Sequence, residues 1–395
     1  MKIALIRKDF LPSRGGGERY AVNLTEGLAN LHHDVHVFAH TWEDPKHPEI
    51  TFHKVETVTT YSPVKNLLFA YNCRRLLTKE SFDIIYSLSQ TYYQDAYRMG
   101  DGIHRHWLRI QNPKPAVRFF KLLTLRQQVI LWLETKTFDP GNTSMIICNS
   151  HLGRRHASMY FNVPEERMCV IYNGVDHKTF HPGIRDEYNA KIRRELQIPS
   201  EAFTILFIAR NFRRKGLDHL IRALPMVKNG KQCVRVLIAG RGDHTPYRRL
   251  ASQIGCGDQL IFVGESESIS RWYGVGDILV HPALYDPFSN VCLEALACGI
   301  PVITTRENGA AEIIKPEETG MVISDPSNRE ELASAISRFV PSHIRVTMQT
   351  KAAQSVRSFT IEENARQTLE IFSRILSMKR GLLLRKIDRE RAREG

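Results

Sequence analysis

Two carboxylates, Asp286 and Glu294, stand eight positions apart in the segment HPALYDPFSNVCLEALACGIPVIT. The apolar run DILVH, residues 277–281, predicts a buried strand before them, and VCLEALA predicts a helix that Gly299 and Pro301 end. Asp286 then precedes the helix, and Glu294 lies inside it. Eight helical residues rise about 12 Å. The two acids could therefore hold the two ends of an extended ligand, such as a nucleotide sugar.

A cluster of cations follows the predicted strand FTILFIA, in the segment ARNFRRKGLDHL, residues 209–220. Arg210 and Lys215 belong to it. Fixed cations at this place would stabilise the charge that grows on a departing diphosphate more than they stabilise the ground state. A solvated basic loop is the alternative for an arbitrary charge run. The position directly after a strand favours the functional interpretation.

Three glycines, Gly15, Gly16 and Gly17, separate the first predicted strand from the amphipathic stretch ERYAVNLTEGLANL. Without side chains they would let a phosphate approach backbone N–H groups at a helix start. The spacing is not that of a GxGxxG fingerprint. A tight turn that needs only permissive backbone angles explains the same glycines equally well.

Length and composition indicate a two-domain globular protein. The chain has 395 residues, 42% hydrophobic and 25% charged, and it contains no apolar run of the roughly 18 residues that a membrane span requires. The seven cysteines are scattered and have no CxxC spacing, which argues against disulfides and a zinc site. The start, MKIALIRKDF, does not predict a signal peptide, so we expect a cytoplasmic protein. A net charge of +13 suits an anionic partner.

Short β-type runs alternate with amphipathic stretches, which is typical of α/β folds with doubly wound parallel sheets. One series is KIALI, DVHVFA, DIIYSL, QDAYRM and SMIICN, and a second is FTILFIA, RVLIAG, QLIFVG, DILVH and PVITT. Turn-rich sequence near 174–186 separates them. We therefore expect domains at 1–180 and 181–358, a closing helix at 359–378 with Ala365, Leu369, Phe372 and Leu376 on one face, and a basic tail at 379–395. The tail could extend the helix, but partial disorder is expected at its end.

Several motifs carry a resemblance to a known family. The segments ARNFRRKG, VIYNGVDHKTFHP, Asp-x7-Glu and GIPVITT occur in the chain order of retaining glycosyltransferases of family four, which have the GT-B fold. Each motif alone is modestly specific, but together they are highly specific, and the resemblance covers nearly the whole chain. It implies two Rossmann-like domains that face each other across a cleft, with a C-terminal helix that packs back on the N-terminal domain. The donor would lie mainly on the second domain and the acceptor mainly on the first.

The resemblance also assigns roles to individual residues. It gives Arg210 and Lys215 to the donor diphosphate, Glu294 to the ribose and Asp286 to hydroxyls of the donor sugar. The amides around Phe288, Ser289 and Asn290 would bind phosphate, and Gly16 and Gly17 would close over the diphosphate. The family usually has Glu where this chain has Asp286, so donor identity does not transfer directly. For Asp286 a turn residue that bonds its own backbone, and for Glu294 a solvated helix acid, are the structural alternatives.

The resemblance implies a retaining reaction by same-face attack, in which the departing phosphate accepts the acceptor's proton. The chain contains no Asp-x-Asp, the acid pair that bridges a metal in other glycosyltransferases, so we expect Arg210 and Lys215 to replace the metal. On the acceptor side, Asp101 and His104 follow the probable strand QDAYRM, where family members often carry an acid or histidine. A histidine satisfied by loop packing is an equal alternative.

Residues 104–136 interleave basic and aromatic side chains, which suits a surface that lies on an anionic bilayer. A purely structural helix pair with a solvated face is the alternative. The resemblance is strongest to the lipopolysaccharide core glucosyltransferase I group, whose acceptor is an anionic glycolipid. This implies glucose transfer from UDP-glucose to the heptose region of the inner core, by a monomer on the inner face of the cytoplasmic membrane.

Other functions remain open at this stage. A GT-B enzyme with a soluble acceptor, a sugar-nucleotide epimerase and a noncatalytic sugar-nucleotide-binding protein all fit the same donor motifs. Nucleic acid is not an expected partner, because the basic residues lie on loops and an apolar segment and no recognition helix, RNP or zinc motif accompanies them.

Overall fold

The computed structural model describes residues 1–12, 15–43, 47–57, 62–230, 232–266 and 268–394, of which 62 and 382–394 are described by their backbone only. The chain divides into two compact units. Unit 1 comprises Met1–Gly174 and Ile361–Gly395, and unit 2 comprises Val175–Thr360. The boundaries expected from the sequence were 180/181 and 358/359. None of the described helices is both long and apolar enough to span a bilayer.

Unit 1 is built on a seven-stranded parallel sheet of order β5-β3-β1-β6-β7-β8-β9. Its strands are β1 (Lys2–Ile6), β3 (Asp34–Ala39), β5 (Ile50–Lys54), β6 (Ile84–Ser87), β7 (Ala96–Met99), β8 (Met145–Cys148) and β9 (Met168–Val170). A small parallel pair, β2 (Asp9–Phe10) with β4 (Thr41–Trp42), adjoins it in sequence. The expected series missed both edge strands, β5 and β9.

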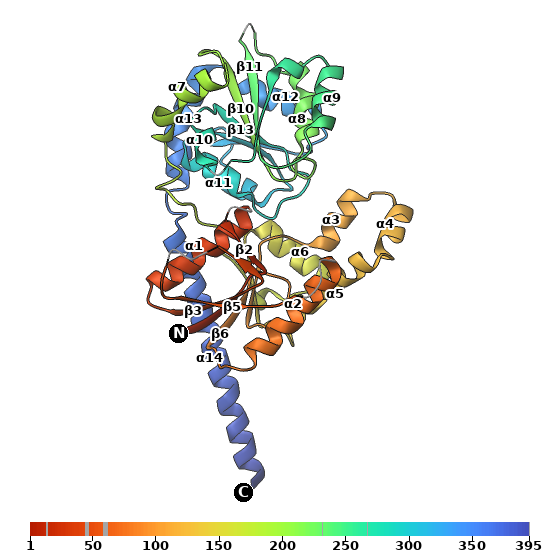
Figure 1. The fold of residues 1–395 in the computed structure, drawn as a ribbon, viewed down its shortest axis with the longest axis vertical. Coiled ribbons are helices and arrows are strands. Elements are labelled where there is room, and N and C mark those ends of the chain that lie inside the picture. Colours follow the sequence, from red (N-terminus) through yellow and green to blue (C-terminus); the bar gives the residue numbers. More distant parts are fainter. Residues whose placement is uncertain (13–14, 44–46, 58–61, 231, 267, 395) are drawn as a thin grey trace. The chain divides into compact units, whose positions relative to one another are not determined.

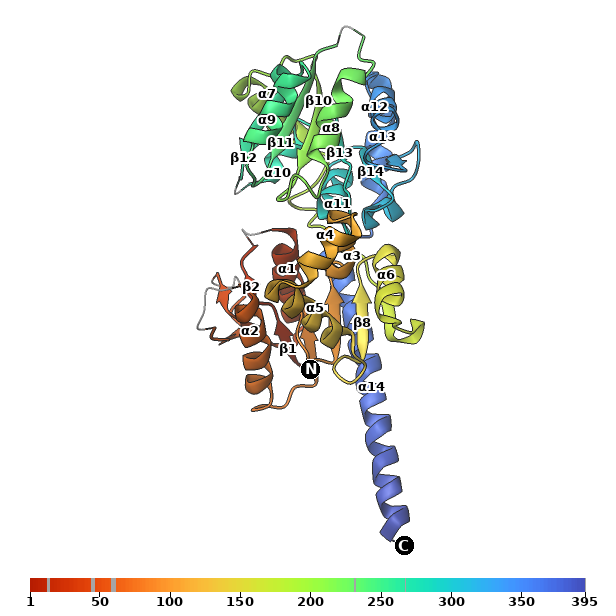
Figure 2. The ribbon, with the colours of Figure 1, turned by 90° about the vertical axis from the view of Figure 1, so that its right-hand side faces the viewer.

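Helices cover both faces of this sheet (Figures 1 and 2). They are α1 (Gly16–Asn30), α2 (Ser62–Leu77), α3 (His104–Gln111), α4 (Pro115–Leu122), α5 (Leu125–Phe138), α6 (His151–Phe161), the 3₁₀ turn Glu165–Arg167 and α14 (Ile361–Glu394). Successive strand residues point to opposite faces. Accordingly, Ile3 and Leu5 of β1 share a core with α1 and α14, whereas Ala4 and Ile6 pack with α2.

The closing helix α14 packs against unit 1, as expected. Ala365 and Phe372 are buried in its core, and Leu369 and Leu376 pack against them. A Cβ added to Gly27 of α1 would lie 3.2 Å from that of Ala365, so the missing side chain allows the two helices to approach closely. The helix continues to Glu394, so the extended helix is found for the tail rather than the partial disorder expected at its end.

Unit 2 has a six-stranded parallel sheet of order β12-β11-β10-β13-β14-β15. The strands are β10 (Phe203–Ile208), β11 (Val234–Ala239), β12 (Leu260–Gly264), β13 (Ile278–His281), β14 (Val302–Thr305) and β15 (Gly320–Ile323). Of these, the edge strand β15 was missed. The helices are α7 (Ile184–Glu195), α8 (Leu217–Ala223), α9 (Thr245–Gln253), α10 (Ser270–Tyr273), α11 (Asn290–Ala297), α12 (Arg329–Arg338) and α13 (Ser342–Ser355), with 3₁₀ turns at Leu224–Met226, Gly257–Gln259 and Gly309–Ile313.

One face of this sheet forms the main core of unit 2. Phe203, Ile205 and Phe207 alternate along β10 toward it. Leu220 of α8, Ala251 of α9 and Ile336 of α12 belong to the same cluster. Continuous apolar strands covered by helices identify a doubly wound α/β unit, as the sequence predicts.

Candidate functional site

Two predicted donor residues of unit 2, Lys215 and Asp286, and one residue that was not predicted, Asn308, follow strands that are neighbours in its sheet. Lys215 comes after β10, Asp286 after β13 and Asn308 after β14, and these strands lie side by side in that order. The carboxyl ends of parallel strands share one edge of a sheet, where doubly wound folds bind ligands. The fold therefore brings together residues that are up to 93 positions apart in sequence, from Lys215 to Asn308.

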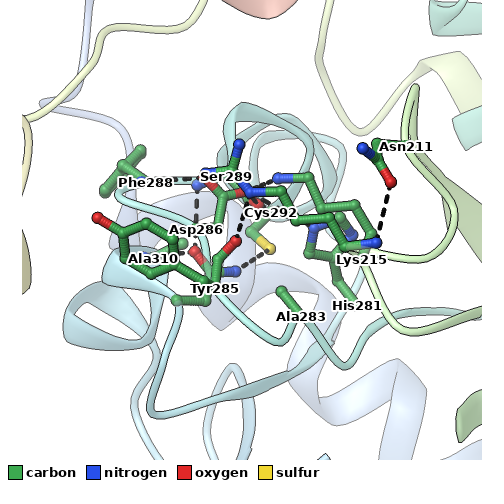
Figure 3. Close-up of polar contacts among 12 residues, drawn as sticks. Asn211, Lys215, His281, Ala283, Tyr285, Asp286, Phe288, Ser289, Cys292 and Ala310 are labelled. Carbon is green, nitrogen blue, oxygen red and sulfur yellow. Dashed lines mark hydrogen bonds and ion pairs between the residues drawn. The ribbon is translucent and has the colours of Figure 1, made fainter. Parts of the chain in front are cut away.

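Lys215 and Asp286 form a direct ion pair in this cluster (Figure 3). The same carboxylate oxygen, Oδ2, accepts a hydrogen bond from the Ser289 hydroxyl, and Oδ1 accepts from the Phe288 amide at 3.3 Å. The Asp286 side chain is 7% exposed and that of Lys215 is 18% exposed. The cluster is thus a largely buried cation and acid at the edge of the sheet.

The loop before Lys215 is held by its own backbone. The amide of Lys215 donates to the Asn211 carbonyl at 3.1 Å, and the amide of Arg214 donates to the Asn211 side chain at 3.0 Å. Gly216 follows with φ +80, and a Cβ there would lie 2.0 Å from the carbonyl oxygen of Pro282. Only glycine fits this turn, which places Lys215 close to the segment that follows β13.

Charge and burial act in opposite directions at the pair. Burial alone would raise the pKa of Asp286, but Lys215, His281 and Arg214 hold that pKa far below its usual range. Burial lowers the pKa of Lys215, and the neighbouring Asp286 opposes this. Burial also lowers the pKa of His281, which favours a neutral ring whose Nε2 lies 2.9 Å from the Ser289 hydroxyl. The charged form of Asp286 is thus strongly favoured beside Lys215, and burial favours the uncharged form of the His281 ring.

The remaining predicted donor residues of unit 2 have their own partners. Glu294 lies inside α11, as predicted, and it is buried rather than solvated; its Oε2 accepts from the Tyr273 hydroxyl at 2.7 Å. Arg210 pairs with Glu265 at 3.4 Å, and Glu265 also holds Arg241 at 2.7 Å. Arg210 and Lys215 thus pair with different acids, so their joint action on a diphosphate stays a prediction.

The amides predicted to bind phosphate are partly engaged within the protein. The amide of Phe288 donates to Asp286, and that of Ser289 donates to the Asn308 side chain at 3.2 Å. Asn290, expected in the turn, is instead the first residue of α11, with Ser289 at the N-cap. A phosphate would have to share or replace the hydrogen bonds that the amides of Phe288 and Ser289 already donate.

In unit 1, Gly17 and Asp101 lie beside the same arginine. The Arg7 guanidinium donates to Glu18 at 2.9 Å and to the Leu88 carbonyl at 2.7 Å, and it lies 3.6 Å from Asp101. A Cβ on Gly17 would lie 3.1 Å from this guanidinium. Gly16 and Gly17 form the first turn of α1 rather than the loop that was expected. The carboxylate of Asp101 is 74% exposed and open to a ligand.

His104 belongs to a different contact group. It begins α3, and its ring Nε2 lies 2.6 Å from the Gln127 side chain of α5. Its amide donates to the buried Glu134 at 2.5 Å, and the amide of Arg105 donates to the same carboxylate. Burial raises the pKa of Glu134 to about 7. Glu134 therefore caps α3 and fixes the position of His104.

Sequence reasoning missed several of these partners. They are Arg7, Glu18, Glu134, Glu265, Tyr273, His281 and Asn308. For His281 and Asn308 a signal existed, because a polar residue at or just after the carboxyl end of a buried strand is a candidate for a site. Glu134 and Tyr273 lie inside helices, and nothing local marks them.

Metal-ligating side chains do not cluster within either unit, as far as the described part of the chain extends. Taken separately, the described residues of neither unit gather three His, Cys, Asp or Glu ligand atoms within 4.8 Å of one another. The candidate site itself offers fixed side-chain charge: a lysine, arginines and carboxylates at a sheet edge that suits a nucleotide.

Comparisons with known proteins agree with this architecture. WaaG of Escherichia coli strain K12, described as a lipopolysaccharide glucosyltransferase, is 23% identical over 331 residues, which cover 82% of this chain and 86% of WaaG. A crystal structure of WaaG superposes with a TM-score of 0.81 at 21% identity, covering 94% of this chain and 99% of that one. MJ1607 of Methanocaldococcus jannaschii, described as an uncharacterized glycosyltransferase, is 25% identical and covers 96% of this chain and 99% of its own length.

A third relative has been solved with ligand. The structure of Anabaena HepE in complex with UDP-glucose has a TM-score of 0.71 at 18% identity and covers 94% of this chain and 99% of that one. At these identities, the structural matches establish the GT-B fold alone.

Two family descriptions match the chain, one for each half. "Glycosyltransferase Family 4" matches residues 14–179, and "Glycosyl transferases group 1" matches residues 189–356. Their order is that of the two Rossmann-like halves, and together they account for most of the chain, which belongs to the GT-B glycosyltransferases of family 4.

Proposed function

We propose that this protein is a retaining, metal-independent hexosyltransferase that moves glucose from UDP-glucose to an anionic glycolipid, in the heptose region of a lipopolysaccharide inner core. The observation that carries the proposal is the cluster of Lys215, Asp286 and Asn308 at the carboxyl edge of the unit 2 sheet. The likeness to WaaG, a lipopolysaccharide glucosyltransferase, supports the acceptor, and the likeness to HepE, solved with UDP-glucose, supports the donor.

In the proposed reaction, the bond between C1 of the sugar and the β-phosphate oxygen breaks. The acceptor oxygen bonds to C1 from the same face, and its proton passes to the departing phosphate oxygen. Lys215 and Arg210 would neutralise the charge that appears there, and this takes the role that a metal ion has in other transferases. Glu294 would accept hydrogen bonds from the ribose. In unit 1, Asp101 and His104 are the proposed acceptor-side groups, and Gly16 and Gly17 would approach phosphate.

An assay that follows both sugar and lipid separates this proposal from its alternatives. Purified protein is incubated with UDP-glucose and deep-core lipopolysaccharide. Glucose on the lipid supports the proposal, an isomer of the UDP-sugar would indicate an epimerase, and tight binding without turnover would indicate a binding protein. Transfer to soluble sugars alone would contradict the glycolipid acceptor.

Glu294→Ala is expected to abolish the thermal stabilisation that a donor gives. A ligand at 100 times its Kd stabilises the native state by about 2.7 kcal/mol, and losing the ribose contact should remove most of this. Thermal-shift scans with UDP-glucose, compared with each variant's own ligand-free Tm, measure the effect.

The matched control is Tyr273→Phe, which removes the same internal hydrogen bond to Glu294 but keeps the carboxylate. This variant should retain the donor-induced shift. If Glu294→Ala shows the wild-type shift, Glu294 does not bind the donor.

The exposed side chains of helix α4 support the proposal that residues 104–136 bind an anionic membrane. None of its residues is buried, and Phe119 and Phe120 are 59% and 69% exposed. Val117, Leu123 and Leu125 are also exposed, with Lys114, Lys121 and Arg126 beside them in sequence. The segment forms three helices, α3 to α5, rather than the helix pair named as the alternative, and in Figure 1 α4 lies to the right of α3 and α5. Exposed aromatics with flanking cations are typical of interfacial binding.

Replacing Phe119 and Phe120 together by aspartate should weaken binding to anionic vesicles by at least about tenfold, because burial of each ring in the interface contributes about 1.5–3 kcal/mol. Cosedimentation with vesicles containing phosphatidylglycerol measures this. Val346→Asp is the control, since Val346 is 64% exposed but lies in α13 of unit 2. Equal binding of the double variant and the wild type would exclude α4 as the membrane contact.

A further inference from the structure

One oxygen of the Asp286 carboxylate, Oδ2, is already saturated with donors inside the protein, and the other accepts one hydrogen bond. Oδ2 takes both the Lys215 ammonium and the Ser289 hydroxyl, and Oδ1 takes the Phe288 amide. The ring of His281 lies 3.8 Å from the same Oδ2. A carboxylate oxygen has about two acceptor sites, so Oδ2 has none left for a sugar hydroxyl.

The backbone keeps this carboxylate facing inward. The amide of Asp286 donates to the Glu307 carbonyl at 2.8 Å, and the amide of Gly309 donates to the Asp286 carbonyl at 2.9 Å. Asp286 and Asn308 form a parallel β-bridge. Both its backbone groups are bonded to the loop after β14, which fixes the main chain of Asp286, and the contacts with Lys215, Ser289 and Phe288 hold its side chain inward.

A lysine side chain needs a fixed acidic partner more than an arginine side chain does. Its ammonium sits on a flexible four-carbon stem, whose freedom is lost when it must act at one point. In this site the Asp286 carboxylate fixes the far end, while the Asn211 carbonyl and the Gly216 turn fix the backbone. Ser289 links the carboxylate to the buried His281, which completes a row of contacts from β13 to Lys215 (Figure 3).

The length of the side chain decides where the charge lies. Asp is shorter by one methylene than the Glu usual at this place in the resembled family, so its carboxylate stays about 1.5 Å nearer the backbone. With this shorter side chain, the Asp286 carboxylate contacts Lys215 and Ser289 and does not extend past them.

We propose that Asp286 is a positioning residue that holds the Lys215 ammonium in place for the departing diphosphate, and that it is not the residue that binds the donor sugar. The inference rests on the proposed function and deepens it. It predicts that a change at Asp286 alters donor affinity only by altering the contact between Lys215 and the diphosphate, and not by altering a contact with the sugar.

The first test compares a nucleoside diphosphate with its sugar. Isothermal titration is run with UDP and UDP-glucose, or with GDP and GDP-mannose if that pair stabilises the wild type. In Asp286→Asn, both affinities should change by the same factor, while kcat falls by about 10²-fold because the cation is misplaced. A selective loss of affinity for the diphosphate sugar, with the diphosphate unchanged, would overturn the inference.

The second test uses the pH dependence of diphosphate binding. Asp286 stabilises the charged form of Lys215 against burial. Without the carboxylate, the lysine should lose its proton at lower pH, so the alkaline limb of UDP binding moves to lower pH in Asp286→Asn. In a Lys215→Arg background the same replacement should no longer move the limb, because arginine does not titrate there.

Different results distinguish a failure to fold, a failure of the inference and a failure of the proposed function. Should Asp286→Asn fail to fold, the double variant Lys215→Met with Asp286→Asn decides, because it removes both charges of the pair. Compared with Lys215→Met alone, it should bind UDP and UDP-glucose with unchanged affinities, and a further loss of affinity for UDP-glucose alone would overturn the inference. An unmoved alkaline limb in a folded Asp286→Asn would also overturn the inference. If the wild type binds neither a diphosphate nor its sugar, the proposed function itself fails.

Discussion

Replacing Asp277 by asparagine is expected to destabilise unit 2 by about 3–5 kcal/mol, the usual cost of breaking a buried ion pair. Asp277 lies at the start of β13, where its carboxylate faces three arginines: Arg185 at 3.0 Å, Arg193 at 3.6 Å and Arg345 at 3.6 Å. Its Oδ2 also accepts from the Thr204 amide at 2.8 Å. Asparagine keeps the shape but leaves three guanidiniums without their shared anion.

Burial makes this arrangement costly to disturb. It lowers the pKa of Arg193 and of Arg345, and Asp277 is the main group that opposes this in both. Each arginine also bonds backbone carbonyls, Arg193 at Pro199 and Arg345 at Phe339. The cluster therefore ties α7 and α13 to the sheet, and its loss should loosen both helices.

Hydrogen exchange followed by mass spectrometry on peptides from β10 and β13 measures the change in unit 2 without assuming that both units unfold together. The control is Glu317→Gln, which breaks the exposed pair of Glu317 with Arg338 at 2.6 Å. Exposed pairs contribute about 0–1 kcal/mol. An Asp277→Asn effect as small as that of the control would contradict this structural role of Asp277.

The fold was predictable from the sequence where apolar runs are buried on both faces. The interior strands β1, β3, β10 and β11 were identified because each consists mainly of apolar residues. The edge strands β5, β9 and β15 were missed. They are short or partly exposed, so their hydrophobic pattern is weak.

For the site, the motifs located Lys215, Asp286 and Glu294 but did not predict their contacts. The direct pairing of Lys215 with Asp286 depends on β10 and β13 being neighbours in the sheet. The anchoring of Asp286 by Glu307 and Gly309 depends on the loop after β14 in the same way. Local sequence carries no information about such pairings, because they arise from strand order.

The second large effect is expected for Lys215→Met, which should lower kcat/KM for glycosyl transfer by about 10²–10³-fold, as the loss of one preorganised charge-stabilising group typically does. Steady-state transfer from UDP-glucose measures it. Lys228→Met is the control, because Lys228 is also a lysine of unit 2 but is exposed. The control should keep wild-type kinetics.

Loss of activity in Lys215→Met has two causes that must be separated, because the variant also leaves Asp286 buried without its cation. That uncompensated charge should lower the free energy of unfolding by about 3–5 kcal/mol. The double variant Lys215→Met with Asp286→Asn removes both charges, so its stability should recover toward the wild type. Its activity should not recover, since the Lys215 cation proposed to face the departing diphosphate is still missing. Activity that returned together with stability would show that Lys215 contributes to the fold and not to the chemistry.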